Sequence, residues 1–244
     1  MPNSYFQFKQ VTINQDKSTL KVCTDACIFG AWAARAIQNS KLEIQNCLDI
    51  GTGTGLLALM LAQKNENILI EAVEIDRSSA EQAAENFEAS PWAGRLNVQH
   101  ISIQQFVNSP THKFDFIISN PPFFENDLKS DLAHKNISKH DESLKLDELL
   151  DCINELLTEK GKFAILLPYH RTGYFISLCE EKELYIEEKL FIKQTPQHDH
   201  FRTIILGSRE ASSHAKESSL TIRKEEGIYS DEFVELLKDY YLYL

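Results

Sequence analysis

Short apolar runs alternate with amphipathic segments along most of the chain. The apolar runs predict seven strands, and the segments between several of them predict helices. The predicted strands are Cys47–Ile50, Ile68–Ile75, Leu96–Ile101, Phe114–Ser119, Lys162–Leu167, Leu184–Ile192 and Thr203–Gly207. The predicted helices are Leu56–Gln63, Ser78–Ala89, Leu144–Leu157 and Gly173–Lys182. This alternation predicts an α/β fold, with a mostly parallel sheet and helices on both of its faces.

The N-terminal part of the chain departs from this alternation. Within residues 5–22, alternating apolar positions predict a hairpin with turn residues at Asn14–Lys17. Thr24 or Asp25 is then a candidate cap for an Ala-rich helix over Ala26–Ile37. Hairpin and helix together predict a small lid over the sheet, and a packing unit without contact to a ligand explains the pattern equally well.

The C-terminal part predicts an extension of the same domain. Serine and charged residues indicate a surface loop at Ala211–Ser219, followed by a short strand at Leu220–Arg223 and a helix at Ser230–Leu237. We therefore expect one domain over residues 1–244, with the lid at 1–40 and the core and its extension at 41–244.

The charge of the chain limits its partners. A net charge of −11 and a pI near 5.2 weigh against general affinity for nucleic acids, because phosphate backbones select concentrated Lys and Arg. Any nucleic-acid surface must therefore be local. No apolar run approaches the roughly 18 residues of a membrane span, and Met1–Ser4 does not begin a signal peptide. We expect a cytoplasmic protein that binds no membrane and needs no obligate protein partner.

The cysteines and histidines form no metal or disulfide pattern. The five cysteines are scattered without a Cys-x-x-Cys pair, and His198 and His200 stand as a pair in a predicted loop. We expect no metal site and reduced cysteines.

A glycine-rich loop follows the first strand of the predicted sheet. Gly51, Gly53 and Gly55 let the backbone approach a ligand at the carboxyl end of that strand. Leu56 stands where a dinucleotide fingerprint requires its third glycine, so the loop does not fit NAD. Asp49, just before the loop, would repel a pyrophosphate and could pair with a positively charged ligand.

Glu74 ends the second strand of the predicted sheet. A carboxylate at that place can accept both hydroxyls of a ribose. Glu74 could instead favour the N-terminus of the next helix, a role that suits Asp76 better.

The fourth strand ends in the sequence Asn120-Pro121-Pro122-Phe123. The Asn120 side-chain oxygen and the Pro121 carbonyl are two acceptors that can hold the two hydrogens of an exocyclic amino group. Phe123 adds a flat apolar face for a planar ring. Asn-Pro is also common turn chemistry, so these residues alone leave a simple turn as an alternative.

In this order and spacing, Asp49 to Gly55, Glu74 and Asn120 to Phe123 resemble a class I, Rossmann-like methyltransferase that uses S-adenosylmethionine. The quartet resembles the subset that methylates planar nitrogens, namely adenine N6, guanine N2 and glutamine amides. The resemblance implies that Asn120, Pro121, Pro122 and Phe123 are catalytic, and that Asn120 also faces the cofactor.

The flanking sequence is similar to one family over nearly the whole chain. The similar segments are Lys21–Asp25, Gly30–Trp32, Ser90–Trp92, His140–Leu144, Arg202–Ile204 and the tail from Tyr229 to Leu242. This family is the bacterial tRNA1(Val) (adenine(37)-N6)-methyltransferases. Membership implies methylation of N6 of adenosine 37 in the anticodon loop of a valine tRNA, with S-adenosylmethionine as the donor.

The resemblance also implies further cofactor contacts. Thr24 would help to enclose the cofactor, beside Asp49, Gly51, Gly53, Gly55 and Glu74. Such enzymes usually place an acid near the cofactor's adenine at the end of the third strand, whereas this chain has Ser102. A hydroxyl can accept a hydrogen bond there without charge.

Basic residues after the quartet predict a local RNA-binding surface. The candidates are Lys129, Lys135, Lys139, His140 and Arg202. Taken singly, each fits an ordinary solvated charge better than an RNA contact.

Other functions remain open on the motifs. A guanine-N2 methyltransferase of rRNA or a glutamine-N5 methyltransferase of proteins would use similar amino-group acceptors, as would a DNA adenine enzyme. A module that binds S-adenosylmethionine without transferring its methyl group is an alternative from another class, although such a module needs no amino-group acceptors.

Overall fold

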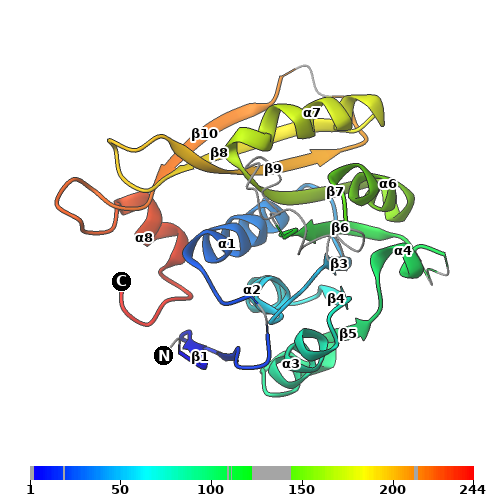
Figure 1. The fold of residues 1–244 in the computed structure, drawn as a ribbon, viewed down its shortest axis with the longest axis horizontal. Coiled ribbons are helices and arrows are strands. Elements are labelled where there is room, and N and C mark those ends of the chain that lie inside the picture. Colours follow the sequence, from blue (N-terminus) through cyan, green and yellow to red (C-terminus); the bar gives the residue numbers. More distant parts are fainter. Residues whose placement is uncertain (1–2, 19, 109, 111, 123–143, 212–213) are drawn as a thin grey trace, which may run out of the picture.

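The centre of the structure is an eight-stranded sheet (Figure 1). The computed structural model describes residues 3–18, 20–108, 110, 112–122, 144–211 and 214–244. The strands are β3 (Asn46–Ile50), β4 (Leu69–Glu74), β5 (Leu96–His100), β6 (Phe114–Ser119), β7 (Leu157–Pro168), β8 (Tyr185–Lys193), β9 (His200–Ser208) and β10 (Lys216–Thr221). Their order across the sheet is β10-β8-β9-β7-β6-β3-β4-β5, and β9 alone among them runs antiparallel to its neighbours.

Helices cover both faces of this sheet. In Figure 1 one layer lies above the sheet and one below it, and each has its own core of buried side chains. One face carries α1 (Thr24–Gln38), α2 (Leu56–Lys64), α3 (Arg77–Glu88) and α8 (Asp231–Leu237). The other carries α4 (Ile103–Phe106), α6 (Leu146–Leu156) and α7 (Thr172–Glu181). Short 3-10 helices stand at η1 (Ala93–Arg95) and η3 (Tyr169–Arg171). The predicted α/β class with a mostly parallel sheet is confirmed.

The middle strands are apolar without interruption because both faces are covered. In β6, Phe116 and Ile118 point to the core under α1 and α2, whereas Ile117 points to the core under α6. In β7, Ala164 and Phe163 face opposite cores in the same way. All five side chains are fully buried, so these strands are fixed in register by packing on both sides.

The predicted count of seven strands is one short, because the C-terminal strand joins the same sheet as β10 and pairs in parallel with β8. The loop predicted at Ala211–Ser219 is wrong over its second half, which belongs to β10. An edge strand is held by backbone hydrogen bonds and leaves polar side chains such as Glu217 and Ser218 exposed. Its sequence therefore carries little apolar pattern.

The N-terminal hairpin forms with a different turn from the predicted one. Its strands are β1 (Tyr5–Gln7) and β2 (Thr12–Asn14), and the chain reverses between them, where the Phe8 amide donates to the Val11 carbonyl at 2.9 Å. Asn14–Lys17 is therefore not the turn of this hairpin. The Gln15 side chain accepts a hydrogen bond from the Val22 amide, and it ties this stretch to the start of α1.

Helix α1 begins at Thr24, and the residue at its N-cap is Cys23, without a side-chain capping bond. The predicted caps Thr24 and Asp25 are therefore wrong. Asp25 lies inside the first turn, where its carboxylate accepts a hydrogen bond from the Arg202 Nε at 2.8 Å. That ion pair joins the start of α1 to the start of β9.

Candidate active site

The predicted site residues follow four neighbouring strands. In the order β6-β3-β4-β5 all four strands are parallel, so their carboxyl ends meet at one edge of the sheet. Asn120 follows β6, the glycine loop follows β3, Glu74 ends β4 and Ser102 lies two residues after β5. This edge is where open α/β sheets bind ligands.

The glycine loop has the backbone that only glycine adopts without strain. Gly53 has φ +58° and Gly55 has φ +83°. A Cβ atom on Gly53 would meet no atom of the chain within 4 Å, so this part of the loop borders open space. A Cβ atom on Gly55 would lie 2.5 Å from Cε1 of Phe87, so Gly55 lets α3 pack against the start of α2.

Asp49 is completely buried beneath this loop. Its Oδ2 accepts a hydrogen bond of 2.6 Å from the Thr52 hydroxyl, while Oδ1 has no hydrogen-bond partner among the described residues. Burial raises the pKa of Asp49 to about 7, whereas the Thr52 hydroxyl and the nearby Ala58 amide act in the opposite direction. A buried acceptor that no donor satisfies is costly, so this oxygen is suited to a donor or a positive charge on a ligand.

Glu74 holds the loop from the neighbouring strand. Its Oε2 accepts from the Gly53 amide and its Oε1 from the Asp76 amide, both at 2.9 Å. Each carboxylate oxygen can accept a second hydrogen bond, so both retain capacity for hydroxyl groups. Asp76 caps α3 as the sequence suggested, because its side chain accepts from the Ser79 amide. The Ser78 hydroxyl is the main cause that lowers the pKa of Asp76.

Asn120 carries the second unsatisfied oxygen at this edge. Its Oδ1 is buried and has no hydrogen-bond partner among the described residues. The preceding Ser119 donates its hydroxyl to the Ile50 carbonyl at 2.8 Å, and this bond fixes the end of β6 against the start of the glycine loop. Pro121 is buried and Pro122 is exposed. Phe123 and the predicted RNA contacts Lys129, Lys135, Lys139 and His140 lie outside the described residues.

Ser102 already has a structural partner. Its hydroxyl accepts a hydrogen bond of 3.2 Å from the Gln105 amide and caps α4. The short helix α4 was not predicted, because four residues carry too little periodicity to be seen.

Two further residues of this region were missed from the sequence. Ile75 is 58% exposed directly after Glu74, so an apolar face lies open beside the carboxylate. Its signal in the sequence is an apolar residue between two acids at a strand end. Asn86 is completely buried, and its side-chain nitrogen donates to the carbonyls of Asn14 and Thr54, both at 2.8 Å. Asn86 thus joins the N-terminal hairpin to the glycine loop, and nothing in its sequence surroundings marks it.

Thr24 and Arg202 lie at the same edge but on the other half of the sheet. Thr24 is exposed at the first position of α1, and Arg202 is held by Asp25 and packs over the Phe201 ring, 5.4 Å from its centre.

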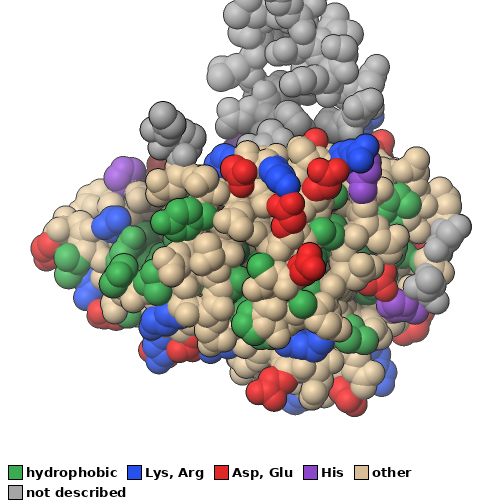
Figure 2. Space-filling view, turned by 90° about the horizontal axis from the view of Figure 1, so that it is seen from below, with side chains coloured by type: hydrophobic (Ala, Val, Ile, Leu, Met, Phe, Trp, Pro, Cys, Tyr) green, Lys and Arg blue, Asp and Glu red, His purple; other side chains and the backbone are tan. Residues whose placement is uncertain are grey.

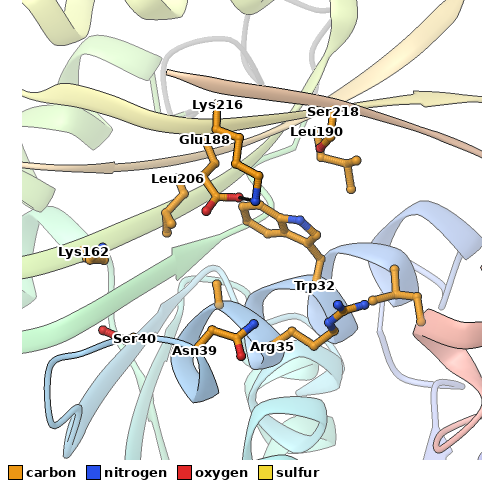
Figure 3. A pocket seen from close by; sticks show the side chains of 12 residues that line it. Trp32, Arg35, Asn39, Ser40, Lys162, Glu188, Leu190, Leu206, Lys216 and Ser218 are labelled. Carbon is orange, nitrogen blue, oxygen red and sulfur yellow. Dashed lines mark ion pairs between the residues drawn. The ribbon is translucent and has the colours of Figure 1, made fainter. Parts of the chain in front are cut away.

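A cavity of about 290 Å³ lies elsewhere, between the C-terminal half of α1 and the strands β7 to β10 (Figure 3). The Trp32 indole points into it, and the ion pair between Lys216 and Glu188 stands at its wall, with 3.6 Å between nitrogen and oxygen. None of the predicted cofactor residues lines this cavity. The glycine loop and Asn120 therefore border a different space.

The charged side chains do not form one large patch on the face shown in Figure 2. Acidic and basic side chains are interspersed there. Among the described residues, no group of three or more His, Cys, Asp or Glu side chains could hold a metal ion. Over the same part of the chain, no helix is both long and apolar enough to cross a membrane.

Comparison with known proteins defines the class. Residues 33–165 match the family model of the methyltransferase small domain. The fold matches a protein described as a predicted O-methyltransferase from Agrobacterium tumefaciens, with a TM-score of 0.64 and 14% identity over 87% of this chain and 95% of that chain. It also matches a putative RNA methyltransferase from Pyrococcus horikoshii, with a TM-score of 0.54 and 16% identity over 77% and 85%. The protein is a class I methyltransferase, and its methyl donor is S-adenosylmethionine.

Three relatives narrow the assignment, and each bears the name tRNA1(Val) (adenine(37)-N6)-methyltransferase. The protein from Dyadobacter fermentans is 41% identical over 98% of both chains. The relative from Flavobacterium johnsoniae is 37% identical over 97% of this chain and 99% of its own, and that from Yersinia pestis is 34% identical over 97% and 93%. This chain belongs to the tRNA1(Val) (adenine(37)-N6)-methyltransferase family, as the sequence motifs indicated.

The residues at the edge of the sheet fit this methyl donor. S-adenosylmethionine carries a sulfonium and an ammonium group, and Asp49 offers a buried oxygen without a partner. The space beside Gly53 is open to a ligand, and Glu74 has acceptor capacity for ribose hydroxyls.

Proposed function

We propose that this protein methylates N6 of adenosine 37 in the anticodon loop of tRNA1(Val), the reaction in the names of its relatives. The observation that carries the proposal is the buried, unsatisfied Oδ1 of Asn120 at the end of β6, beside the glycine loop. An acceptor at this position suits a donor on a substrate, and an exocyclic amino group is such a donor.

Asn120 and Pro121 would orient the amino group. The lone pair of adenine N6 is delocalised into the ring, so this nitrogen is a poor nucleophile while it stays planar. Two fixed acceptors, the Asn120 Oδ1 and the Pro121 carbonyl, favour a pyramidal nitrogen and aim its lone pair. S-adenosylmethionine supplies an already activated methyl group, so the residues contribute mainly alignment.

Pro122 and Phe123 would complete the quartet, with Phe123 stacking on the target base. The target base must leave its stack to reach Asn120, and an anticodon loop makes this extrusion cheaper than a duplex does.

The cofactor would be held by residues of three strand ends. We assign Asp49 to the positive charge of the cofactor, Gly51, Gly53 and Gly55 to the close backbone approach, and Glu74 to the ribose. Ile75 offers an apolar surface for the adenine ring, and Ser102 keeps lone-pair capacity for its amino group. Thr24 would close the site from the start of α1.

The tRNA would be gripped locally, because the chain as a whole is acidic. The proposed contacts are Lys129, Lys135, Lys139, His140 and Arg202. We further propose that the whole chain acts as one methyltransferase domain and that it works in the cytoplasm.

The test uses labelled S-adenosylmethionine and total tRNA from a strain that lacks this protein, followed by nucleoside and position mapping. The expected product is N6-methyladenosine at position 37 of tRNA1(Val). Label that appears only in protein or as N2-methylguanosine would instead support the glutamine or guanine alternatives.

The Asn120→Ala variant tests the role of the motif. Loss of one acceptor that acts in the transition state should lower kcat by about 10² to 10³ while the Kd for S-adenosylmethionine stays within a few-fold. Asn97→Ala, at an exposed position of β5, is the matched control and should keep full activity. Turnover near the wild-type rate in Asn120→Ala would refute the assignment.

A further inference from the structure

Three aromatic rings form a partly exposed cluster at the catalytic edge of the sheet. Tyr169, Phe191 and His200 come from η3, β8 and β9, and their ring centres lie 5.7 Å (Tyr169 to Phe191), 5.2 Å (Tyr169 to His200) and 5.2 Å (Phe191 to His200) apart. Tyr169 is 42% exposed, and the other two rings are half-buried. Aromatic rings that are not packed into a hydrophobic core leave a flat surface on which a ligand can stack.

The cluster and Asn120 lie at the same edge of the sheet. Ser119 pairs with Ile165 across β6 and β7, and Tyr169 follows Ile165 by four residues along the same direction. Phe191 lies on β8, three strands from β6 in the sheet order, which is roughly 14 Å at the usual strand spacing. This distance spans about four stacked base steps of a nucleic acid, so nucleotides a few positions away from a base at Asn120 can reach the cluster.

Two basic residues lie near the three rings in the chain and in the sheet. Arg171 packs over the Tyr174 ring, 5.1 Å from its centre, and Tyr174 is itself 50% exposed. Lys193 is half-buried and pairs in register with His200. The charge of Lys193 also contributes to a lowered pKa of His200, for which burial is the larger cause. A neutral imidazole can stack on a base without the free-energy cost of removing a charge from water. Asp199, next to His200, is the acid of this stretch and is exposed.

Aromatic faces interleaved with Lys and Arg are the features that bind unpaired nucleotides, since every base has a flat face and every linkage a phosphate. A protein partner is less well matched, because the rings lie among charged residues rather than in a continuous apolar patch. We propose that Tyr169, Phe191 and His200 form a stacking platform for an unpaired nucleotide a few positions from the target adenosine, and that Arg171 and Lys193 contact its phosphates. This inference rests on the proposed function, because it needs an RNA substrate at Asn120.

Tyr169→Ala tests the platform, with Tyr169→Phe as the conservative variant. Loss of one base stack should raise the Kd for an unmodified tRNA1(Val) transcript by roughly 5- to 100-fold and raise KM in parallel. The expected kcat and the Kd for S-adenosylmethionine are unchanged, and Tyr169→Phe should restore tRNA affinity to within about twofold. Tyr185→Ala is the matched control, because Tyr185 is 36% exposed at the opposite end of the strand that carries Phe191.

Single abasic substitutions at positions up to about four nucleotides on either side of adenosine 37 in the transcript test the contact directly. For the wild-type protein one of these substitutions should weaken binding, and for Tyr169→Ala the same substitution should add little, since both changes remove one stack. Additive losses, or tRNA affinity of Tyr169→Ala within twofold of wild type, would overturn the inference, as would an equal loss in Tyr185→Ala. A wild-type protein that neither binds nor methylates the transcript would refute the proposed function itself, and the platform with it.

Discussion

The affinity of the protein for S-adenosylmethionine should rise with pH through neutrality. Asp49 is completely buried, and burial raises its pKa from 3.8 to about 7. A cationic ligand against its free oxygen favours the ionised carboxylate, so binding below neutral pH must release the proton of Asp49. Above the folded-state pKa the carboxylate is already ionised, and no such cost remains.

The size of the effect follows from that pKa. If only the ionised form binds well, the apparent Kd should increase about tenfold between roughly pH 8 and roughly pH 6, or about 1.4 kcal/mol. Asp49→Asn keeps the size of the side chain and an acceptor for the Thr52 hydroxyl but removes the titration. Its Kd should be higher than that of wild type at pH 8 and should lose the pH dependence that comes from Asp49.

The same shift predicts a change in stability with the opposite sign. A carboxyl group whose pKa is raised on folding binds more protons in the folded protein, so the free energy of unfolding falls as pH rises from about 4 to about 7. Without ligand, Asp49→Asn should therefore be more stable than wild type at pH 8, by up to about 4 kcal/mol for a shift of about three pH units.

Calorimetric titration with S-adenosylmethionine at several pH values measures the first effect. Two buffers of different ionisation enthalpy count the released protons, and urea unfolding without ligand measures the second effect. The amino group of the ligand titrates equally with both proteins, so their difference isolates Asp49. A wild-type Kd that changes less than twofold over this range, or an unchanged pH dependence in Asp49→Asn, would refute the reasoning.

Two further substitutions test how the loop is held. Gly55→Ala should lower the free energy of unfolding by about 2–5 kcal/mol in urea titrations, because it puts an alanine in a left-handed conformation and makes it clash with Phe87. The control is Gly94→Ala, which should be nearly neutral because its Cβ atom meets no atom within 4 Å. Equal stability of the two variants would contradict the packing described here. Glu74→Gln places an amide nitrogen against a backbone N–H and should weaken binding of S-adenosylmethionine by about 10- to 100-fold. Unchanged affinity would show that Glu74 neither orders the loop nor meets the ligand.

The sequence predicted those parts of the fold whose pattern is set by burial. Strands such as Phe114–Ser119 are apolar because helices cover both faces, and a run of that kind is visible without the structure. The edge strand β10 was predicted only at its end, as Leu220–Arg223, because backbone pairing holds its exposed first part. The four-residue α4 was missed because one capping serine holds it. The hairpin turn was predicted at the wrong place, because Asn14–Lys17 has typical turn residues. The Gln15 side chain instead accepts a hydrogen bond from the Val22 amide, and no local sequence pattern indicates this bond.

The site residues also divide into those with a local sequence signal and those placed only by the tertiary structure. Asp49, the glycines and Glu74 carry local signals, since residue type and strand end together indicate a ligand. Asn86 and the ion pair between Asp25 and Arg202 join segments far apart in the chain, and such pairings follow only from the tertiary structure.

The first and last segments of the described chain contact each other next to α2. Phe8 forms a β-bridge with Tyr241, the Lys9 amide donates to the Tyr240 carbonyl, and the Tyr240 hydroxyl donates to the Met60 carbonyl on α2. During synthesis Tyr240 and Tyr241 leave the ribosome after every residue that they contact. The N-terminal hairpin, which Asn86 ties to the glycine loop, therefore gains its full set of contacts only after the rest of the sheet has been translated. A chain that stops before Tyr240 would lack these contacts, so the anchoring of the N-terminal hairpin depends on residues that are translated after the whole sheet.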